Sequence, residues 1–180
     1  MFNYLGNITD LYHNIIKEYC LNKAVAVDAT LGNGGDCDFL CDNFQKVYAF
    51  DIQQSAVDKY SLKNVHNVEV ICDSHSNMNK YIKDQVDIII FNLGFLPGGD
   101  KHITTEADTT IEAIRNGLTL LRSQGMMIIA VYTGHEEGEV EGQAVMDYVS
   151  ELPKNQYGVM LHRVINRSKS APFLLLIEKK

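Results

Sequence analysis

The chain has 180 residues, of which 46% are hydrophobic and 22% charged, and its formal net charge is −7. This length and composition are typical of one globular domain, so we expect residues 1–180 to form a single domain. No run approaches the ~18 apolar residues of a membrane span, and no basic stretch leading into an apolar core opens the chain, so we expect a cytoplasmic protein with no membrane contact. The acidic total argues against a surface that coats nucleic acid broadly.

Basic residues are concentrated near the C-terminus, and the four cysteines are spread over residues 20–72. Residues 151–180 contain six Lys or Arg against two Glu, which is compatible both with a local phosphate-contacting surface and with a solvated end of a sheet. The four cysteines include no CxxC pair, and Cys37 and Cys41 are one helical turn apart. We therefore expect reduced, mostly buried thiols rather than a metal site or a disulfide framework.

Apolar patterning predicts strands that alternate with helices. Such alternation favours a Rossmann-like α/β fold, with a seven-stranded, mostly parallel sheet and helices on both faces. The last two strands are joined without a helix and should form an antiparallel C-terminal hairpin. In chain order we expect a helix at 8–21, a strand at 23–28, a glycine turn, a helix containing Phe39 and Phe44, a strand at 46–51, a helix at 53–60, strands at 68–72 and 86–91, a helix at 106–122, a turn at Gly125, a strand at 126–131, a helix at 140–152 and strands at 157–165 and 172–177.

The glycine turn is the segment Asp28-Ala29-Thr30-Leu31-Gly32-Asn33-Gly34-Gly35-Asp36. Glycines there allow positive φ and a close approach of backbone to ligand, and the helix start offers unpaired N–H groups to an anionic group. A tight strand–helix connection without a ligand is the alternative interpretation. The turn alone does not decide between them.

Polar residues end four of the predicted strands: Asp28, Asp51, Asp73 and Asn92. In parallel sheets ligands bind outside these carboxyl ends. Asp51, 23 residues after Asp28, is suitably placed to accept hydrogens from the two hydroxyls of a ribose. Any one of these residues could instead cap a helix or lie in a solvated turn, but together they predict a nucleotide-type site.

Three nucleotide classes compete for this site. A triphosphate-binding P-loop needs a Lys after its glycines, and none follows here. A dinucleotide fingerprint needs a third glycine where the chain has Cys37. S-adenosylmethionine, which has no phosphates, needs the close backbone approach, a ribose acid and an adenine pocket. Asp73, Ser74 and His75 could supply that pocket, with Asp73 facing the adenine amino group.

The segment Asn92-Leu93-Gly94-Phe95 indicates the acceptor. Amino-group methyltransferases commonly carry Asp/Asn-Pro-Pro-aromatic at this place, where carbonyl oxygens accept hydrogens from a neutral amine. Asn92 and Phe95 match the polar and aromatic ends of that tetrapeptide, without the double proline. The alternative is that Asn92 caps its turn and Phe95 fills the core.

Taken together, several segments resemble one family, the small class I methyltransferases of the YtqB or MnmM type, once labelled "putative rRNA methylases". The resemblance implies methylation of the 5-aminomethyl group of the tRNA wobble uridine by direct displacement, giving 5-methylaminomethyl-(2-thio)uridine. It departs at Cys37, where Thr is usual, and at Ala171-Pro172, where two prolines are usual. The segments are the glycine turn, Phe50-Asp51-Ile52-Gln53, Asn92-Leu93-Gly94-Phe95-Leu96-Pro97-Gly98-Gly99-Asp100-Lys101, Thr109-Thr110 and Tyr132-Thr133-Gly134-His135-Glu136-Glu137-Gly138.

The predicted site residues fall into three groups. Asn92 orients the amine, and Asp100 or His135 accepts its proton, directly or through water. The predicted cofactor-binding residues are Asp28, Thr30, Gly32, Asn33, Gly34, Asp36, Asp51, Gln53, Asp73, Ser74, His75, Asn92 and Gly94. The predicted substrate-binding residues are Phe95 and Tyr132 at the base, Lys101 at a phosphate or base edge, and Arg163, Arg167 and Lys169 along the tRNA.

The expected partners are S-adenosylmethionine and the anticodon stem-loop of tRNA, with homodimerisation left open. No metal is expected, because Glu139 stands where a second His would complete an HExxH motif. Two other classes remain: an rRNA or small-molecule amine methyltransferase of the same fold, and a non-enzymatic module that binds the cofactor without turnover. The net acidity is the best sequence argument for the small-molecule acceptor, and the family resemblance outweighs it.

Overall fold

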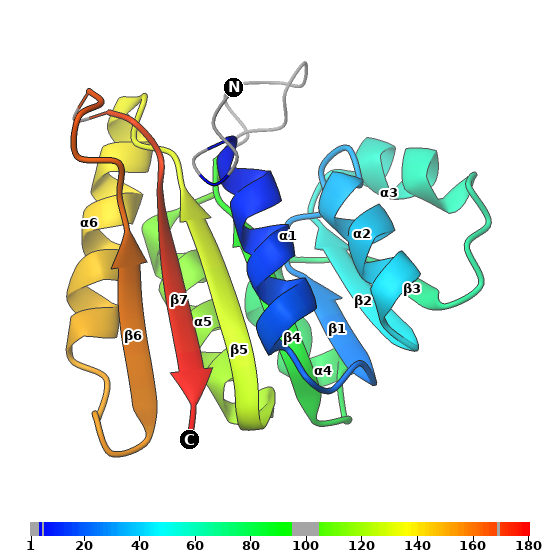
Figure 1. Cartoon of the computed structure of the whole chain (residues 1–180). Coiled ribbons are helices and arrows are strands. Elements are labelled where there is room, and N and C mark those ends of the chain that lie inside the picture. Colours follow the sequence, from blue (N-terminus) through cyan, green and yellow to red (C-terminus); the bar gives the residue numbers. More distant parts are fainter. Residues whose placement is uncertain (1–3, 5, 95–104, 169) are drawn as a thin grey trace.

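The computed structural model describes residues 4, 6–94, 105–168 and 170–180. Within them, seven strands form one sheet in the order β3-β2-β1-β4-β5-β7-β6 (Figure 1). Strands β1 to β5 run parallel, and β7 is antiparallel to both of its neighbours, which confirms the predicted fold class. In chain order the elements are α1 (Ile8–Tyr19), β1 (Val25–Asp28), α2 (Gly35–Asn43), β2 (Lys46–Asp51), α3 (Gln54–Ser61), β3 (Val68–Cys72), the 3-10 turn η1 (His75–Asn77), α4 (Met78–Tyr81), β4 (Val86–Asn92), α5 (Ala107–Leu120), β5 (Leu121–Val131), α6 (Glu136–Ser150), β6 (Tyr157–His162) and β7 (Phe173–Lys179).

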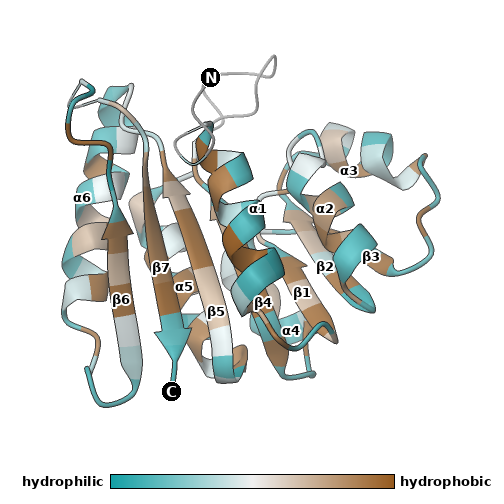
Figure 2. Ribbon diagram, viewed as in Figure 1, coloured by the Kyte–Doolittle hydropathy of each residue, from teal (hydrophilic) through white to brown (hydrophobic). Residues whose placement is uncertain are grey.

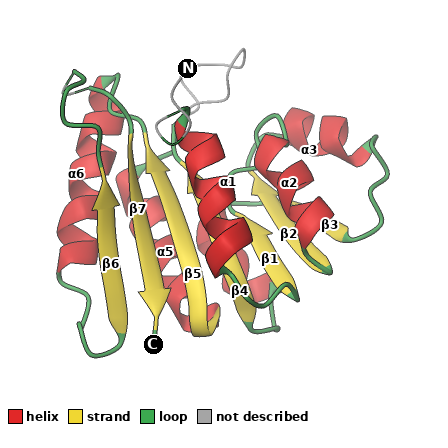
Figure 3. Ribbon diagram, in the orientation of Figure 1, coloured by secondary structure: helices red, strands yellow, loops and turns green. Residues whose placement is uncertain are grey.

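Helices cover both faces of the sheet (Figure 3). Side chains alternate between the faces along each strand, so β4 sends Ile88 and Ile90 toward α1 and α2, and Ile89 and Phe91 toward α5. Because both faces are buried, the central strands carry uninterrupted apolar runs, such as residues 88–91 of β4 (Figure 2). The apolar runs that predicted the strands are therefore the two-sided core of the molecule.

Helix α6 begins at Glu136, four residues before the predicted start. Three acidic residues occupy its first turn, where a helix N-terminus favours negative charge. A Cβ added at Gly138 would overlap the backbone oxygen of Tyr132, so glycine is required for this turn to pack against the end of β5. The acidic run therefore belongs to the helix and not to the loop before it.

The α5–β5 connection also differs from the prediction. Helix α5 ends at Leu120, and β5 starts at Leu121 instead of Met126, with a register shift against β4. The residue with positive φ is Gln124 (65°) and not Gly125. The expected glycine turn is thus an irregular first part of β5.

Other departures are small. The strand predicted at 157–165 ends at His162, where its pairing with β7 ends. The short segments η1 and α4 carry no 3.6-residue apolar pattern long enough to predict them. No helix in the described part of the chain is both long and apolar enough to span a membrane.

Candidate active site at the carboxyl edge of the sheet

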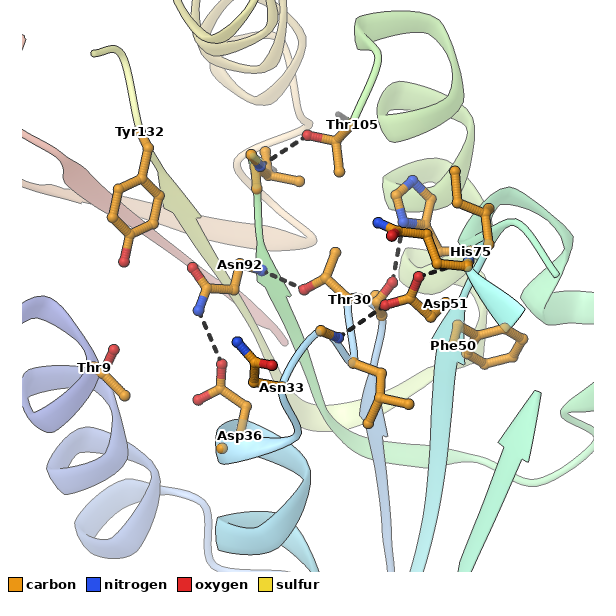
Figure 4. A pocket seen from close by; sticks show the side chains of 18 of the residues that line it. Thr9, Thr30, Asn33, Asp36, Phe50, Asp51, His75, Asn92, Thr105 and Tyr132 are labelled. Atoms are coloured by element: carbon orange, nitrogen blue, oxygen red, sulfur yellow. Dashed lines mark hydrogen bonds between the residues drawn. The ribbon is translucent and has the colours of Figure 1, made fainter. Parts of the chain in front are cut away.

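A cavity of about 910 Å³ opens at the carboxyl ends of the parallel strands. This is the edge at which parallel α/β sheets bind ligands. Its walls come from the turn after β1, the ends of β2 to β5 and the N-terminal part of α1 (Figure 4). Of the predicted residues, those that line it are Thr30, Gly32, Asn33, Asp36, Asp51, Gln53, Asp73, Ser74, His75, Asn92, Gly94, Tyr132 and His135.

The glycine turn forms one wall of the cavity. Gly32 and Gly34 have positive φ, 52° and 82°. A Cβ at Gly34 would overlap the ring of Tyr60, so both backbone conformation and space require glycine at this position. The turn is fixed to the end of β2 by the Leu31 N–H, which donates to the Phe50 carbonyl at 2.8 Å.

Asp28 lies behind this wall and does not line the cavity. Its side chain is fully buried, and its Oδ1 accepts a hydrogen from the Thr30 N–H at 3.0 Å. Its Oδ2 has no hydrogen-bond partner, and burial raises the pKa of the carboxyl well above its usual value. Its geometry supports the turn that carries Thr30, which differs from the direct cofactor contact expected from the sequence.

Asp51 joins the ends of β1 and β2. Its Oδ2 accepts from the Gly32 N–H at 2.9 Å, and its Oδ1 accepts from the Gln53 N–H at 2.8 Å. Each carboxylate oxygen has a second lone pair, so both can accept a further hydrogen. The carboxylate is therefore held by the backbone with one acceptor position per oxygen remaining for a pair of hydroxyls.

The turn after β3 offers two different acceptors. Hydrogen bonds from Asn77 and Tyr81 lower the pKa of Asp73, so its carboxylate is ionised over a wider pH range. His75 Nδ1 donates to the Ala29 carbonyl at 3.1 Å, which leaves Nε2 as an acceptor, buried and without a partner. Burial lowers the pKa of His75 and thus favours this neutral form.

Asn92 ends β4 at the centre of the cavity. Its backbone N–H donates to Thr30 Oγ1 at 2.8 Å, and its side-chain Nδ2 donates to Asp36 Oδ2 at 3.1 Å. Asp36 also accepts from Tyr12 and His13 of α1, both at 2.7 Å through Oδ1. The N-terminal helix is thereby connected to the wall that holds Asn92, a contact that sequence analysis did not predict.

Sequence analysis also missed Glu141, a buried carboxylate near the cavity. Glu141 of α6 accepts from the hydroxyls of Thr105 and Thr110, both at 2.6 Å, and Thr105 Oγ1 accepts from the Gly94 N–H at 3.0 Å. Burial raises the pKa of Glu141 against the opposing effect of both hydroxyls. Its helical spacing from the buried Val145 and Val149 was the available signal, because a glutamate on an apolar stripe needs partners.

The rim of the cavity carries an aromatic side chain and a histidine. Tyr132 follows β5, and burial, followed by the charge of Asp36, raises the pKa of its phenol. Its hydroxyl points toward Thr9 of α1 (Figure 4). His135 precedes the first turn of α6 and lines the same cavity.

Two of the residues predicted to contact tRNA, Arg163 and Arg167, do not line the cavity. Arg163 and Arg167 are exposed in the segment between β6 and β7, and Ser170 of that segment lines the cavity. The Arg163 guanidinium lies 4.5 Å from the centre of the Phe173 ring. Phe95, Asp100, Lys101 and Lys169 fall outside the described residues.

Comparisons with known proteins define the class of this fold and site. A crystal structure from Clostridium thermocellum, described as a putative rRNA-methylase, is 34% identical with a TM-score of 0.91, covering 98% of this chain and 99% of that one. A putative methyltransferase from Streptococcus mutans, solved in complex with SAH, is 37% identical with a TM-score of 0.88 and the same coverage. The chain is a class I, S-adenosylmethionine-dependent methyltransferase.

The family follows from two further matches. The family described as "Putative rRNA methylase" matches residues 47–178. A protein of Arabidopsis thaliana is named tRNA (mnm(5)s(2)U34)-methyltransferase, chloroplastic. It is 30% identical over an alignment 192 residues long, which covers 96% of this chain and 69% of that protein. The chain belongs to the family described as "Putative rRNA methylase".

The cavity fits S-adenosylmethionine on the chain's own geometry. Asp51 retains an acceptor position on each oxygen for the ribose hydroxyls, and the unpartnered Nε2 of His75 is a buried acceptor for an N–H group. The glycine wall allows close approach of the methionine part. The described residues contain no group of three or more His, Cys, Asp or Glu that could hold a metal ion, and all four cysteines are free thiols, Cys20 and Cys37 being buried.

Proposed function

We propose that this protein methylates the 5-aminomethyl group of the wobble uridine of tRNA, producing 5-methylaminomethyl-(2-thio)uridine. Asn92 carries the proposal, because it places an amide in the middle of the cavity with its Nδ2 already donating to Asp36. The remaining carbonyl oxygen accepts hydrogens, which suits a primary amine. The tRNA methyltransferase of Arabidopsis, 30% identical over most of this chain, supports a tRNA acceptor.

The residues of the β1–β3 edge would hold the cofactor. Asp51 would accept hydrogens from the ribose, and Gly32, Asn33 and Gly35 would contact the methionine part, while Asp73, Ser74 and His75 would surround the adenine. Gly34, which the sequence also predicted for the cofactor, does not line the cavity. When bound, S-adenosylmethionine supplies a sulfonium methyl group open to attack by a nucleophile. The protein holds the two reactants in a fixed relative orientation, which contributes up to ~7–11 kcal/mol in well-aligned systems.

The β4–β5 edge would bind and orient the acceptor. Asn92 Oδ1 would accept an amine N–H, which turns the nitrogen lone pair away from the amide and toward the cofactor side. An alkyl amine is largely protonated near neutral pH, so a proton must leave first. His135 lines the cavity and is the described candidate for accepting it, while Tyr132 offers an aromatic face to the uridine.

Arg163 and Arg167 would contact tRNA phosphates. Both are exposed on the segment whose Ser170 reaches the cavity, so a phosphate bound there belongs to a nucleotide near the modified base. Such a local contact would be compatible with both an RNA substrate and the net charge of −7. Lys101 and Lys169 stay predictions from the sequence.

Labelled methyl transfer tests the proposal. The protein is incubated with labelled S-adenosylmethionine and, separately, tRNA carrying 5-aminomethyluridine, the same tRNA lacking the aminomethyl group, rRNA, and free alkyl amines. We expect label only in the first tRNA. Label in rRNA would support the acceptor named in the family description, and label in free amines would support a small-molecule methyltransferase. Binding of the cofactor without transfer to any acceptor would indicate a non-enzymatic module.

A further inference from the structure

The carboxylate of Asp36 accepts hydrogens from three side chains at the base of the cavity. Tyr12 Oη lies 2.7 and 2.8 Å from its two oxygens, His13 Nε2 lies 2.7 Å from Oδ1, and Asn92 Nδ2 lies 3.1 Å from Oδ2. Asp36 is 7% exposed and Tyr12 fully buried. Asp36 lies in the first turn of α2, where an acid is favourable without any side-chain donors. The three donors to its carboxylate are therefore more than the start of a helix requires.

The acceptor-only character of the carboxylate fixes the orientation of the Asn92 amide. An amide has a donating and an accepting end, and only the NH₂ end can face a carboxylate. The Oδ1 atom of Asn92 is therefore turned away from Asp36, on the side that faces Tyr132 (Figure 4). Without Asp36, the NH₂ group could point into the cavity and would repel the hydrogens of an amine.

Other contacts hold the rest of this assembly in place. The backbone of Asn92 is fixed by its N–H bond to Thr30 Oγ1 at 2.8 Å, so rotation of the side chain is the freedom that remains. On the other side, His13 stacks on Phe39 of α2, with ring centres 3.7 Å apart and planes 5° apart. Helix α1 thus positions the carboxylate, and the carboxylate positions the amide.

We propose that Asp36, held by Tyr12 and His13, is a positioning residue that keeps Asn92 Oδ1 facing the substrate amine. This assigns Asp36 a role through Asn92 rather than the direct cofactor contact expected from the sequence. The inference rests on the proposed function, because it requires an acceptor whose N–H groups Asn92 binds. It also gives the N-terminal helix a part in methyl transfer that cofactor binding does not require.

The first test compares turnover with cofactor affinity in Asp36→Asn. This variant keeps the shape of the side chain but can present an NH₂ group to Asn92. We expect kcat for methyl transfer to fall by about 10- to 100-fold, the range of one hydrogen bond to a charged group, while the affinity for S-adenosylmethionine changes by less than about 3-fold. A loss of cofactor affinity as large as the loss of kcat would contradict the positioning role.

A double-mutant cycle with Asn92→Ala separates positioning from a general structural effect. If Asp36 acts through Asn92, then Asp36→Asn should lower kcat by less than about 2-fold once Asn92 is alanine. A structural role predicts the same fold-loss in both backgrounds. Equal losses would overturn the proposal. The cycle compares the wild type, the two single variants and the double variant, and all rates are referred to that of the wild type on 5-aminomethyluridine tRNA.

Two tyrosine variants complete the design. Tyr12→Phe removes a donor to Asp36 and keeps the buried ring, so it should lower kcat only when Asn92 is present; it provides the same cycle if Asp36→Asn does not fold. Tyr60→Phe is the matched control, because Tyr60 of α3 donates at 2.9 Å to Asp38, another acid of α2, and neither residue lines the cavity. Absence of product from the wild type would contradict the proposed function, whereas product with equal losses in both backgrounds would contradict the positioning role alone.

Discussion

On the β1–β3 side of the cavity, strand-end carboxylates accept hydrogens from nearby backbone: Asp51 from Gln53 two residues on, and Asp73 from Ser74 one residue on. On the β4–β5 side, polar side chains bond to each other across the fold, with Asn92 and Asp36 56 residues apart in the chain and Thr105 and Glu141 36 apart. Apart from the bond from the Gly32 N–H to Asp51, which links the ends of two neighbouring strands, local chain geometry holds these carboxylates, whereas tertiary packing holds the side chains of the second side. Changes on the first side should therefore affect cofactor binding, and changes on the second should affect turnover, RNA binding or stability.

Asp51→Ala should have the largest effect. It removes both carboxylate oxygens that are proposed to accept from the ribose and also releases the N–H groups of Gly32 and Gln53. Isothermal titration should show affinity for S-adenosylmethionine weakened by more than about 100-fold, because two hydrogen bonds to a charged acceptor are lost. Asp58→Ala, an exposed carboxylate on α3, is the control and should bind normally. Normal binding by Asp51→Ala would show that the ribose lies elsewhere.

Asn92→Ala should separate the two sides of the cavity. Its side chain is the proposed acceptor for the amine, and the bond between its backbone N–H and Thr30 survives the substitution. We expect cofactor affinity within about 3-fold of wild type and kcat lowered by about 10- to 100-fold. The opposite pattern, normal turnover with weak cofactor binding, would reverse the assignment of the two sides.

Replacing Arg163, Arg167 and Lys169 by alanine should weaken tRNA binding by about 10-fold and flatten its dependence on salt, by roughly one unit of slope for each lost phosphate contact. The double variant Lys154→Ala, Lys180→Ala is the control. These exposed cations lie before β6 and after β7, at the end of the two strands opposite to the β6–β7 connection that carries the arginines. Fluorescence anisotropy over a salt series measures both quantities. Unchanged tRNA affinity would mean that the basic segment is only a solvated surface.

Glu141→Gln should have the smallest effect, on stability. The folded-state pKa of Glu141 is raised from its ordinary value of 4.5, so the folded protein binds more protons than the unfolded chain between the two values. Wild-type stability should therefore fall, relative to the variant, as pH rises from 4.5 through the raised pKa, with a slope of at most about 1.4 kcal/mol per pH unit. Denaturation over a pH series checks this.

Glu139→Gln is the matched control, since Glu139 lies two residues before Glu141 on the same helix and is exposed. Its stability should follow the wild-type pH profile. Parallel curves for wild type and Glu141→Gln would show that burial does not shift the titration of Glu141. The measurement thus tests whether the acceptor side of the cavity is held by a buried acid.

The sequence predicted the side of the site that depends on local structure. The strand ends and the glycine turn can be located from consecutive residues, and the spacing from Asp28 to Asp51 can be counted in the sequence. The turn that lines the cavity could therefore be predicted. The buried position of Asp28 was not, because a fully buried strand end and an exposed one have the same local sequence. Apolar periodicity likewise placed the strands, while the irregular start of β5 depends on its register with β4.

The contacts of Asp36 and Glu141 could not be predicted in the same way. Each depends on which helix packs where, and Tyr12 is 24 residues from Asp36 in the chain. Glu141 lies inside the helix predicted at 140–152, at helical spacing from Val145 and Val149, but its partners Thr105 and Thr110 lie 36 and 31 residues away in the chain. Predicting which side chains hydrogen-bond across the fold requires the tertiary arrangement of the helices as well as the apolar periodicity of each helix.

Nucleoside mass spectrometry of the reacted tRNA tests the central claim most directly. tRNA carrying 5-aminomethyluridine, with and without the 2-thio group, is incubated with the protein and S-adenosylmethionine, digested, and compared with the reaction of Asn92→Ala. The account predicts conversion of 5-aminomethyluridine into 5-methylaminomethyluridine by the wild type and strongly reduced conversion by the variant. Unconverted 5-aminomethyluridine after wild-type treatment, with methylation found on another nucleoside, would contradict it.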